Sequence, residues 1–138
     1  MTEQKKTIRF IQFLPGIAWF LFTLTLICLP GEDVPEEPGW LLIPDFDKLV
    51  HAGLFGGIVF WFCMPFKKSR LTRSEKINLF IRITIATVIW GITTEYIQKF
   101  FIEGRQFDLV DWAADSAGAI IAFFVSRRFF LNPKTQTF

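Results

Sequence analysis

The apolar residues of this chain fall into four long blocks that are separated by short polar gaps. The blocks cover about residues 11–29, 49–66, 77–102 and 109–126, and most charged residues lie between them. Each block has about the 17–25 residues that a helix needs to cross a hydrocarbon layer about 30 Å thick. The pattern predicts an all-α polytopic membrane protein, a bundle of four transmembrane helices formed by a single domain over residues 1–138.

Polar and small residues recur every three or four positions in the third and fourth blocks, so each set forms one stripe along a helix. A stripe that faced lipid would leave polar groups unpaired, and we therefore expect the stripe of the third block to face the interior of the bundle. In the second block, Gly53 and Gly57 have the spacing that lets two membrane helices approach closely. The stripe residues are Thr84, Thr87, Gly91, Thr94, Glu95 and Gln98 in the third block and Asp108, Asp111, Asp115, Gly118 and Ala122 in the fourth.

Composition alone changes this picture little. The chain is 51% hydrophobic and 20% charged, whereas soluble domains average roughly 45–50% and 25%. The arrangement in blocks excludes a disordered chain, a secreted disulfide scaffold and a free nucleic-acid binder. The two cysteines, Cys28 and Cys63, fall near opposite faces of the membrane and are too far apart to form a disulfide. The first block has no A-x-A-like cleavage site, and we expect it to remain as a membrane anchor.

Charge is distributed very unequally between the two sides of the predicted membrane protein. If all four blocks span, one side carries both termini and the middle gap, with 12 of the 15 basic residues and two acids. The other side carries three basic residues and 11 acids, so the formal charges are +10 and −8. Under the positive-inside rule both termini are cytoplasmic. The basic gap is expected to lie against anionic lipid, so the predicted partner is the bilayer and not a nucleic acid.

Several ionisable residues nevertheless lie inside the blocks, where each costs at least about 2.5–3.5 kcal/mol at mid-membrane. Glu95 lies seven residues inside the outer end of its block, and Asp115 lies seven residues after Asp108, so both are about 10 Å deep at 1.5 Å per residue. His51 and Asp111 lie about one turn deep in their own helices. Three helices therefore place polar side chains at one level of the outer leaflet. The candidate binding site comprises Asp47, Lys48, His51, Glu95, Gln98, Arg105, Asp108, Asp111 and Asp115.

Carboxylates this close together and this deep would repel one another, so either a cation joins them or some of them hold a proton. A salt bridge from Arg105 to Asp111 or Glu95 would relieve part of the excess negative charge. Some residues of the candidate binding site also have a simpler, purely structural explanation. Asp47 and Asp108 would be helix N-caps, with Asp111 favourable near a helix N-terminus. Lys48 and Lys99 would only extend to the interface, His51 would only pack, and Lys99 is also spaced to pair with Glu95.

The order and spacing of these motifs indicate a family. The motifs are Asp47-Lys48-x-x-His51, Glu95-x-x-Gln98, Arg105-x-x-Asp108-x-x-Asp111 and Gly118. Together they cover almost the whole chain, which resembles the VanZ-like family of small bacterial integral membrane proteins. The family often has Asn at the position of Asp115. The resemblance implies a multi-pass protein of the bacterial cytoplasmic membrane, with a link to resistance against the glycopeptide teicoplanin by a mechanism that is not established.

Three functions fit the candidate site. The first is a binding site, open to the outer leaflet, for a lipid headgroup, a cell-wall precursor or part of a glycopeptide. In that case Lys48 and Arg105 would bind phosphate or carboxylate, while the carboxylates would bind amines or hydroxyls.

The second function is that of a membrane enzyme that acts on a lipid-linked substrate. His51 would serve as a general base, or would join the carboxylates as a ligand of a divalent metal. The third is a proton-coupled transporter, for which the inner half offers no matching polar path. The sequence assigns no catalytic residue, no metal ligand and no cofactor, and it leaves the ligand and the oligomeric state open.

Overall fold

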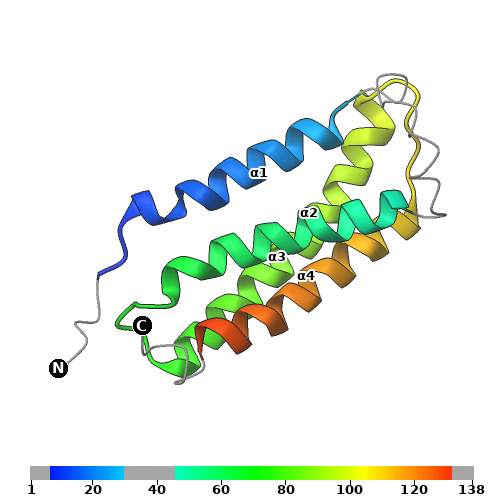
Figure 1. Cartoon of the computed structure of the whole chain (residues 1–138). Coiled ribbons are helices and arrows are strands. Elements are labelled where there is room, and N and C mark those ends of the chain that lie inside the picture. The colour runs from blue at the N-terminus through cyan, green and yellow to red at the C-terminus, as the bar shows by residue number, and fades with distance from the viewer. Residues whose placement is uncertain (1–6, 30–45, 132–138) are drawn as a thin grey trace.

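A computed structural model describes residues 7–29 and 46–131, and this part of the chain contains helices and no strands. The elements are the 3₁₀ helix η1 (Phe10–Phe13), α1 (Leu14–Ile27), α2 (Phe46–Cys63), the 3₁₀ helix η3 (Met64–Phe66), α3 (Arg73–Phe101) and α4 (Leu109–Phe130) (Figure 1). Four helical segments are long and apolar enough to cross a membrane, namely Phe10–Ile27, Phe46–Phe66, Arg73–Phe101 and Leu109–Phe130. The prediction of an all-α chain with four such helices is confirmed.

The helix ends differ from the apolar blocks by up to four residues. α3 begins at Arg73 and not near residue 77, because Thr72 caps it and accepts a hydrogen bond from the backbone N–H of Glu75. The first turn of α3 is polar, so a hydropathy pattern does not include it in the helix. α2 begins at Phe46, so Asp47 lies in its first turn, and the prediction that Asp47 is the N-cap is wrong. α4 continues past residue 126 to Phe130, with basic residues in its last turn, where the helix dipole favours them.

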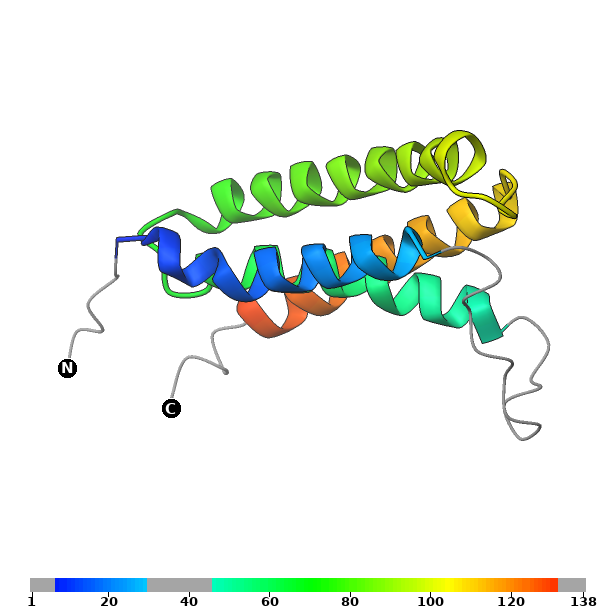
Figure 2. The ribbon, with the colours of Figure 1, turned by 90° about the horizontal axis from the view of Figure 1, so that it is seen from above.

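The helices form a bundle in which α4 packs against both α2 and α3, while α1 lies at the edge along α2 (Figures 1 and 2). The start of η1, the turn between α2 and α3 and the end of α4 lie at one end of the bundle. The turn from α3 to α4 lies at the opposite end. Consecutive helices therefore run in opposite directions, as expected for successive membrane crossings.

Glycines permit the closest helix contacts. A Cβ atom on Gly118 of α4 would overlap the backbone of Ala52 in α2, and one on Gly56 would lie 3.0 Å from the Gly118 carbonyl oxygen. A Cβ on Gly57 would overlap the indole of Trp19, which donates a hydrogen bond of 2.9 Å to the Leu54 carbonyl oxygen. Gly53 has nothing within 4 Å of such an atom. The prediction of a close approach is thus confirmed for Gly57 and wrong for Gly53.

The polar stripe of α3 faces the interior, as predicted. Its six members are all buried, and so are Asp115, Gly118 and Ala122 of the α4 stripe. The Thr84 and Thr87 hydroxyls donate hydrogen bonds of 2.8 and 2.9 Å to the carbonyl oxygens of Phe80 and Ile83. These threonines therefore bring polar atoms into the bundle without needing a partner from another helix.

Gly118→Ala is expected to lower the free energy of unfolding by about 1–3 kcal/mol, because the added methyl group meets backbone atoms that cannot rotate away. Gly53→Ala is the matched control. It adds the same atom to open space, and alanine is the better helix former by about 1 kcal/mol. Thermal unfolding of both variants in detergent would measure the difference. Equal stability of the two variants would contradict the assigned contact.

Candidate functional site

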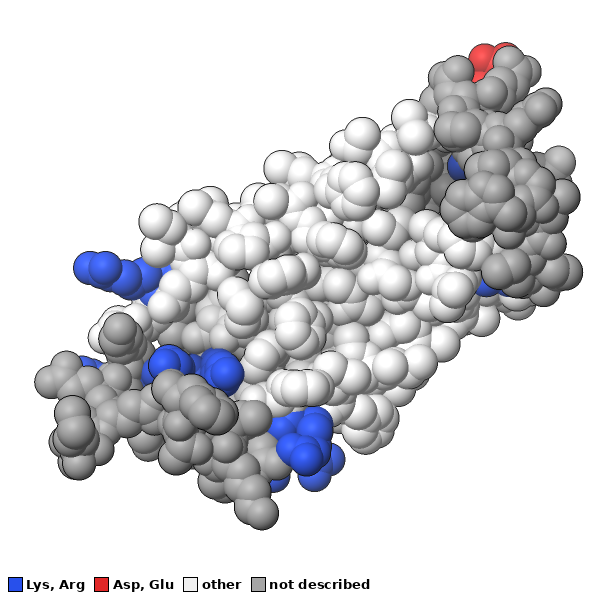
Figure 3. Space-filling model, viewed as in Figure 1, with Lys and Arg blue, Asp and Glu red and all other residues white. Residues whose placement is uncertain are grey.

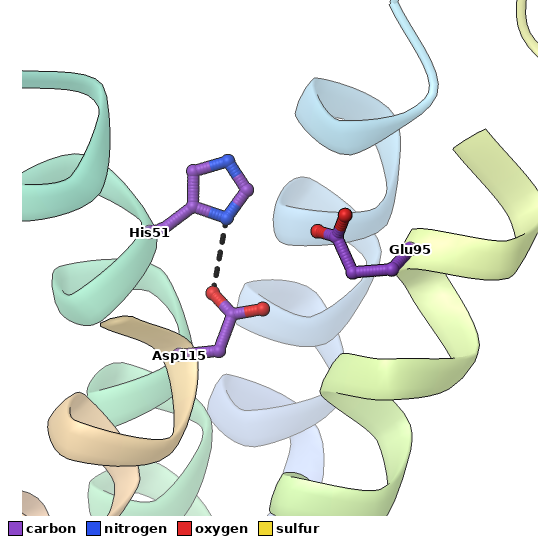
Figure 4. A group of neighbouring side chains, drawn as sticks. All are labelled: His51, Glu95 and Asp115. Carbon is purple, nitrogen blue, oxygen red and sulfur yellow. Dashed lines mark hydrogen bonds and ion pairs between the residues drawn. The ribbon is translucent and has the colours of Figure 1, made fainter. Parts of the chain in front are cut away.

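Three ionisable side chains from three helices converge inside the bundle (Figure 4). The imidazole Nδ1 of His51 on α2 lies 3.0 Å from the Oδ1 atom of Asp115 on α4. Glu95 on α3 points toward the same space, and each of the three residues offers one ligand atom within 4.8 Å of the others. Glu95 and Asp115 are both 0% exposed. The sequence prediction that His51, Glu95 and Asp115 lie at a similar depth in the bundle is therefore confirmed.

Local packing explains why the Asp115 carboxylate fits between α3 and α4. A Cβ atom on Gly91 would lie 3.3 Å from the Asp115 Oδ2 atom and 3.2 Å from a ring carbon of Trp112. The Trp112 indole N–H donates a hydrogen bond of 3.1 Å to the Val88 carbonyl oxygen. Glycine at position 91 thus leaves the space that the carboxylate occupies, and Trp112 fixes the first turns of α4 against α3. The sequence placed Gly91 in the stripe but gave no signal for Trp112.

Asp111 and Lys48 form the outer part of the site. The Lys48 ammonium lies 3.7 Å from the Asp111 Oδ1 atom and 3.2 Å from the Asp47 Oδ2 atom. The His51 Nε2 atom lies 3.9 Å from the Asp111 Oδ2 atom. The imidazole is therefore placed between a fully buried carboxylate, Asp115, and a partly exposed one, Asp111. We refer to His51, Glu95, Asp111 and Asp115 as the His–carboxylate cluster.

Asp108 connects Glu95 to the beginning of α4. Its side chain accepts a hydrogen bond of 2.7 Å from the Val110 N–H, so the predicted N-cap is confirmed. Its own backbone N–H donates a hydrogen bond of 2.8 Å to the Glu95 Oε2 atom. This second contact could not be predicted, because a backbone donor leaves no mark in the sequence pattern. This hydrogen bond fixes the Oε2 atom of Glu95, while the Oε1 atom has no hydrogen-bond partner among the described residues.

Two further predicted members play other parts. The Gln98 amide donates a hydrogen bond of 3.2 Å to the Ile27 carbonyl oxygen and so holds the end of α1 against α3. Arg105 forms no ion pair with any residue in the described ranges, and its Nε atom is buried without a hydrogen-bond partner there. Its expected salt bridge to Asp111 or Glu95 is therefore wrong.

The expected pairing of Lys99 with Glu95 is also wrong. Lys99 is exposed, and its ammonium lies 5.3 Å from the centroid of the Phe100 ring. Glu95, four residues earlier, faces the interior of the bundle. The spacing of the two residues is suitable for an ion pair, but the helix presents them on different faces.

The carboxylates of the cluster keep oxygen atoms that accept no hydrogen bond from a described group, although the Asp111 Oδ1 atom lies 3.7 Å from the Lys48 ammonium. Glu95 Oε1, Asp111 Oδ1 and Asp115 Oδ2 are buried and have no hydrogen-bond partner within 7–29 and 46–131. A buried polar atom without a partner costs about 1–3 kcal/mol, and more when it is charged. The cluster therefore has the composition of a site that accepts a proton, an amine, a hydroxyl or a metal cation.

Comparison of the chain with protein-family models, with curated proteins and with solved structures finds no match. The resemblance to the VanZ-like family stays a prediction, and the function is inferred from the geometry of the site.

Asp108→Ala is expected to lower the free energy of unfolding by about 1 kcal/mol, because the first turn of α4 loses the acceptor that caps the Val110 N–H. Asp108→Asn keeps an acceptor oxygen and is expected to stay close to the parent chain. Denaturation in detergent would measure both variants. A loss of the same size in the asparagine variant would show that the charge of Asp108, and not its capping oxygen, stabilises the helix.

Proposed function

We propose that this chain is a VanZ-like protein of the bacterial cytoplasmic membrane that binds the polar headgroup of an envelope lipid or of a lipid-linked cell-wall precursor. The ligand would be held at the His–carboxylate cluster and Lys48. The single observation that carries the proposal is the set of buried carboxylate oxygens without a partner, supplied by α3 and α4 around His51. Structural carboxylates in a membrane bundle are normally paired, so these atoms favour a ligand.

The graded exposure of the site supports binding from one end of the bundle. The side chains of Lys48 and Asp111 are 26% and 15% exposed, whereas Glu95 and Asp115 are fully buried. A headgroup that enters from this end meets a cation and a carboxylate first and reaches the deeper carboxylates afterwards. Lys48 provides an ammonium for a phosphate, and the deeper oxygens provide acceptors for hydroxyl or amine groups.

An apolar hollow supports a ligand with a hydrocarbon tail. It has a volume of about 310 Å³, lies among α1, α2 and α3, and is lined mainly by Phe20, Ile58, Phe62, Ile83, Thr87 and Trp90. Ile58 follows His51 by seven residues and Thr87 precedes Glu95 by eight, so the hollow lies about 10–12 Å farther along the helices than the cluster. In a bilayer this depth is occupied by acyl chains. A headgroup at the cluster and a tail in the hollow match the two ends of one lipid.

The distribution of basic residues supports an outward orientation of the cluster. Lysine and arginine side chains gather at the end of the bundle opposite the cluster (Figure 3). The described residues of this group are Arg9, Lys67, Lys68, Arg70, Arg73, Lys76, Arg127 and Arg128. By the positive-inside rule that end, with both termini, would face the cytoplasm, and the cluster would open to the outer leaflet.

A membrane enzyme that acts on a lipid-linked substrate is the second candidate. It is favoured by the hydrogen bond between His51 and Asp115, because a carboxylate at one ring nitrogen orients an imidazole for general-base chemistry at the other. A proton-coupled transporter is less well supported. The threonine hydroxyls in the other half of α3 donate to carbonyls of their own helix and leave no evident polar path among the described residues.

Headgroup binding is expected to depend on Glu95 and Asp111. The purified chain would be incubated in detergent with a bacterial envelope lipid extract, and retained lipid would be quantified by mass spectrometry. Glu95→Gln and Asp111→Asn are expected to reduce retention about tenfold, the effect of losing a charged hydrogen bond.

Glu103→Gln is the control for lipid retention. Glu103 is an exposed acid that lies outside the cluster but at the same end of the helix bundle. The same variants, compared in cells for protection against teicoplanin, would test the link that the resemblance implies. Full retention of lipid by well-folded Glu95→Gln and Asp111→Asn variants would refute the proposal.

The proposed orientation can be tested by labelling single cysteines in a chain whose Cys28 and Cys63 are replaced by alanine. Glu103→Cys, beyond the end of α3, is expected to react with a membrane-impermeant maleimide in intact cells. Arg70→Cys, between η3 and α3, is expected to react only after the membrane is permeabilised. The reverse pattern would place the cluster on the cytoplasmic side.

A further inference from the structure

We propose that His51, Glu95 and Asp115 bind one divalent transition-metal ion, Zn²⁺ or Mn²⁺, and that this ion receives the phosphate of the headgroup. The metal site stands on the geometry of the three residues alone. The phosphate as its outer ligand rests on the proposed function.

The spacing of the three side chains suits coordination. With bonds of about 2.1 Å, adjacent ligand atoms lie about 3.0 Å apart around an octahedral metal and about 3.4 Å apart around a tetrahedral one such as Zn²⁺. The His51 Nδ1 and Asp115 Oδ1 atoms are 3.0 Å apart. The ligand atoms of all three residues lie within 4.8 Å of one another, so the Glu95 side chain must move closer to the other two for the set to reach coordination distance.

The atoms that lack partners are those that a metal needs. Glu95 uses its Oε2 atom to accept the Asp108 N–H, and its buried Oε1 atom has no partner in the described chain. The Oδ2 atom of Asp115 is likewise buried and unpartnered there. Glu95 is thus oriented by one protein contact and keeps one buried oxygen for a metal. Contacts of this kind orient ligands in metal sites. Asp115 gives up its hydrogen bond with His51 when Nδ1 binds the metal, so both of its oxygens are then available as ligands.

The second nitrogen of His51 fits the same arrangement. If Nδ1 binds the metal, the proton of the neutral imidazole lies on Nε2, which is 3.9 Å from the Asp111 Oδ2 atom. Histidine ligands of metals usually direct this second N–H toward a carboxylate or carbonyl group. At 3.9 Å this contact has ion-pair distance and is not a hydrogen bond, so Asp111 must approach the ring to orient it. Lys48, 3.7 Å from Asp111, balances its charge.

Charge balance also favours a dication. A neutral His51 with ionised Glu95 and Asp115 carries two negative charges, which one divalent ion neutralises. Within the described residues, neither Arg105 nor Lys99 pairs with Glu95. Burial of an uncompensated carboxylate is strongly unfavourable. The dication removes this cost.

The ligand types select the metal. One imidazole and two carboxylates favour Zn²⁺ or Mn²⁺ over Ca²⁺ and Mg²⁺, which prefer oxygen ligands alone. Three protein ligands leave at least one coordination position open, as in zinc sites that bind a substrate. The partly exposed Lys48 lies on the outer side of the site. A phosphate, which the carboxylates alone would repel, would be attracted by the ion and this ammonium together.

Metal content is the direct test. The full-length chain, purified in detergent, stripped with a chelator and then dialysed against Zn²⁺ or Mn²⁺, is expected to hold about one ion per chain by elemental analysis. Glu95→Gln and Asp115→Asn are expected to weaken binding at least about tenfold, whereas Glu103→Gln is expected to bind as the parent does. A parent chain that takes up no stoichiometric metal overturns the proposal, and Glu95 then holds a proton.

A second measurement needs no variant and so does not depend on variant folding. Co²⁺ added to the stripped parent chain is expected to give visible d–d absorption, which Zn²⁺ then removes by competition. The melting temperature of the stripped chain is expected to rise with Zn²⁺, because an ion that binds only the folded state stabilises it. Absence of both signals overturns the metal site.

Lipid retention with and without chelator separates this inference from the proposed function. Vesicles of phosphatidylglycerol serve as the phosphate probe, and removal of the metal is expected to lower their binding about tenfold. Binding that is unchanged by chelation overturns the phosphate contact and leaves headgroup binding intact. A chain that holds the metal but binds no lipid overturns the proposed function and leaves the metal site standing.

Discussion

The geometry of the candidate site depends on one contact, the approach of α4 to α2 at Gly118 and Ala52. The two backbones are so close there that no side chain fits on Gly118. His51 precedes Ala52 by one residue, and Asp115 precedes Gly118 by three, so the contact that packs the helices also brings the imidazole and the carboxylate to 3.0 Å. The close approach of the backbones therefore positions the ionisable groups that we propose bind a ligand.

The buried threonines and the buried carboxylates of the bundle differ in the hydrogen-bond partners that they require. A threonine hydroxyl carries its own donor, so Thr84, Thr87 and Thr94 satisfy themselves on carbonyl oxygens of α3 at 2.7–2.9 Å. An ionised carboxylate only accepts, and the carbonyl groups of a helix offer it nothing. Glu95 and Asp115 must therefore find donors or cations elsewhere. The bundle supplies each with one partner and leaves one oxygen over, which is why the site stands out from the rest of the stripe.

Much of the fold could be predicted from the sequence, because hydropathy marks helices that cross a membrane and the stripe on α3 marks an interior face. The partners across helices could not be predicted in the same way. Successive residues point about 100° apart on a helix, so the spacing of Gly53 and Gly57 did not reveal that Gly56 meets α4. Depth placed His51, Glu95 and Asp115 together correctly, whereas the pairing of Lys99 with Glu95 failed because it needed the rotation of the helix. The backbone N–H of Asp108 has no signature in the sequence at all.

The position of α1 bears on how a lipid reaches the site. The helix supplies no member of the cluster, and its side-chain hydrogen bonds to the other helices are those of Trp19 with Leu54 and of Gln98 with Ile27, among the described residues. Between these contacts the centroids of the Phe20 ring of α1 and the Trp90 ring of α3 lie 5.3 Å apart, and the apolar hollow lies beside this pair. The sparsely packed wall of a bundle is the part that opens at least cost in free energy. Movement of α1 would admit an acyl chain from the bilayer and leave the α2, α3 and α4 contacts around the cluster undisturbed. A ligand whose tail stays in the membrane therefore fits this architecture better than a polar solute that must enter from water.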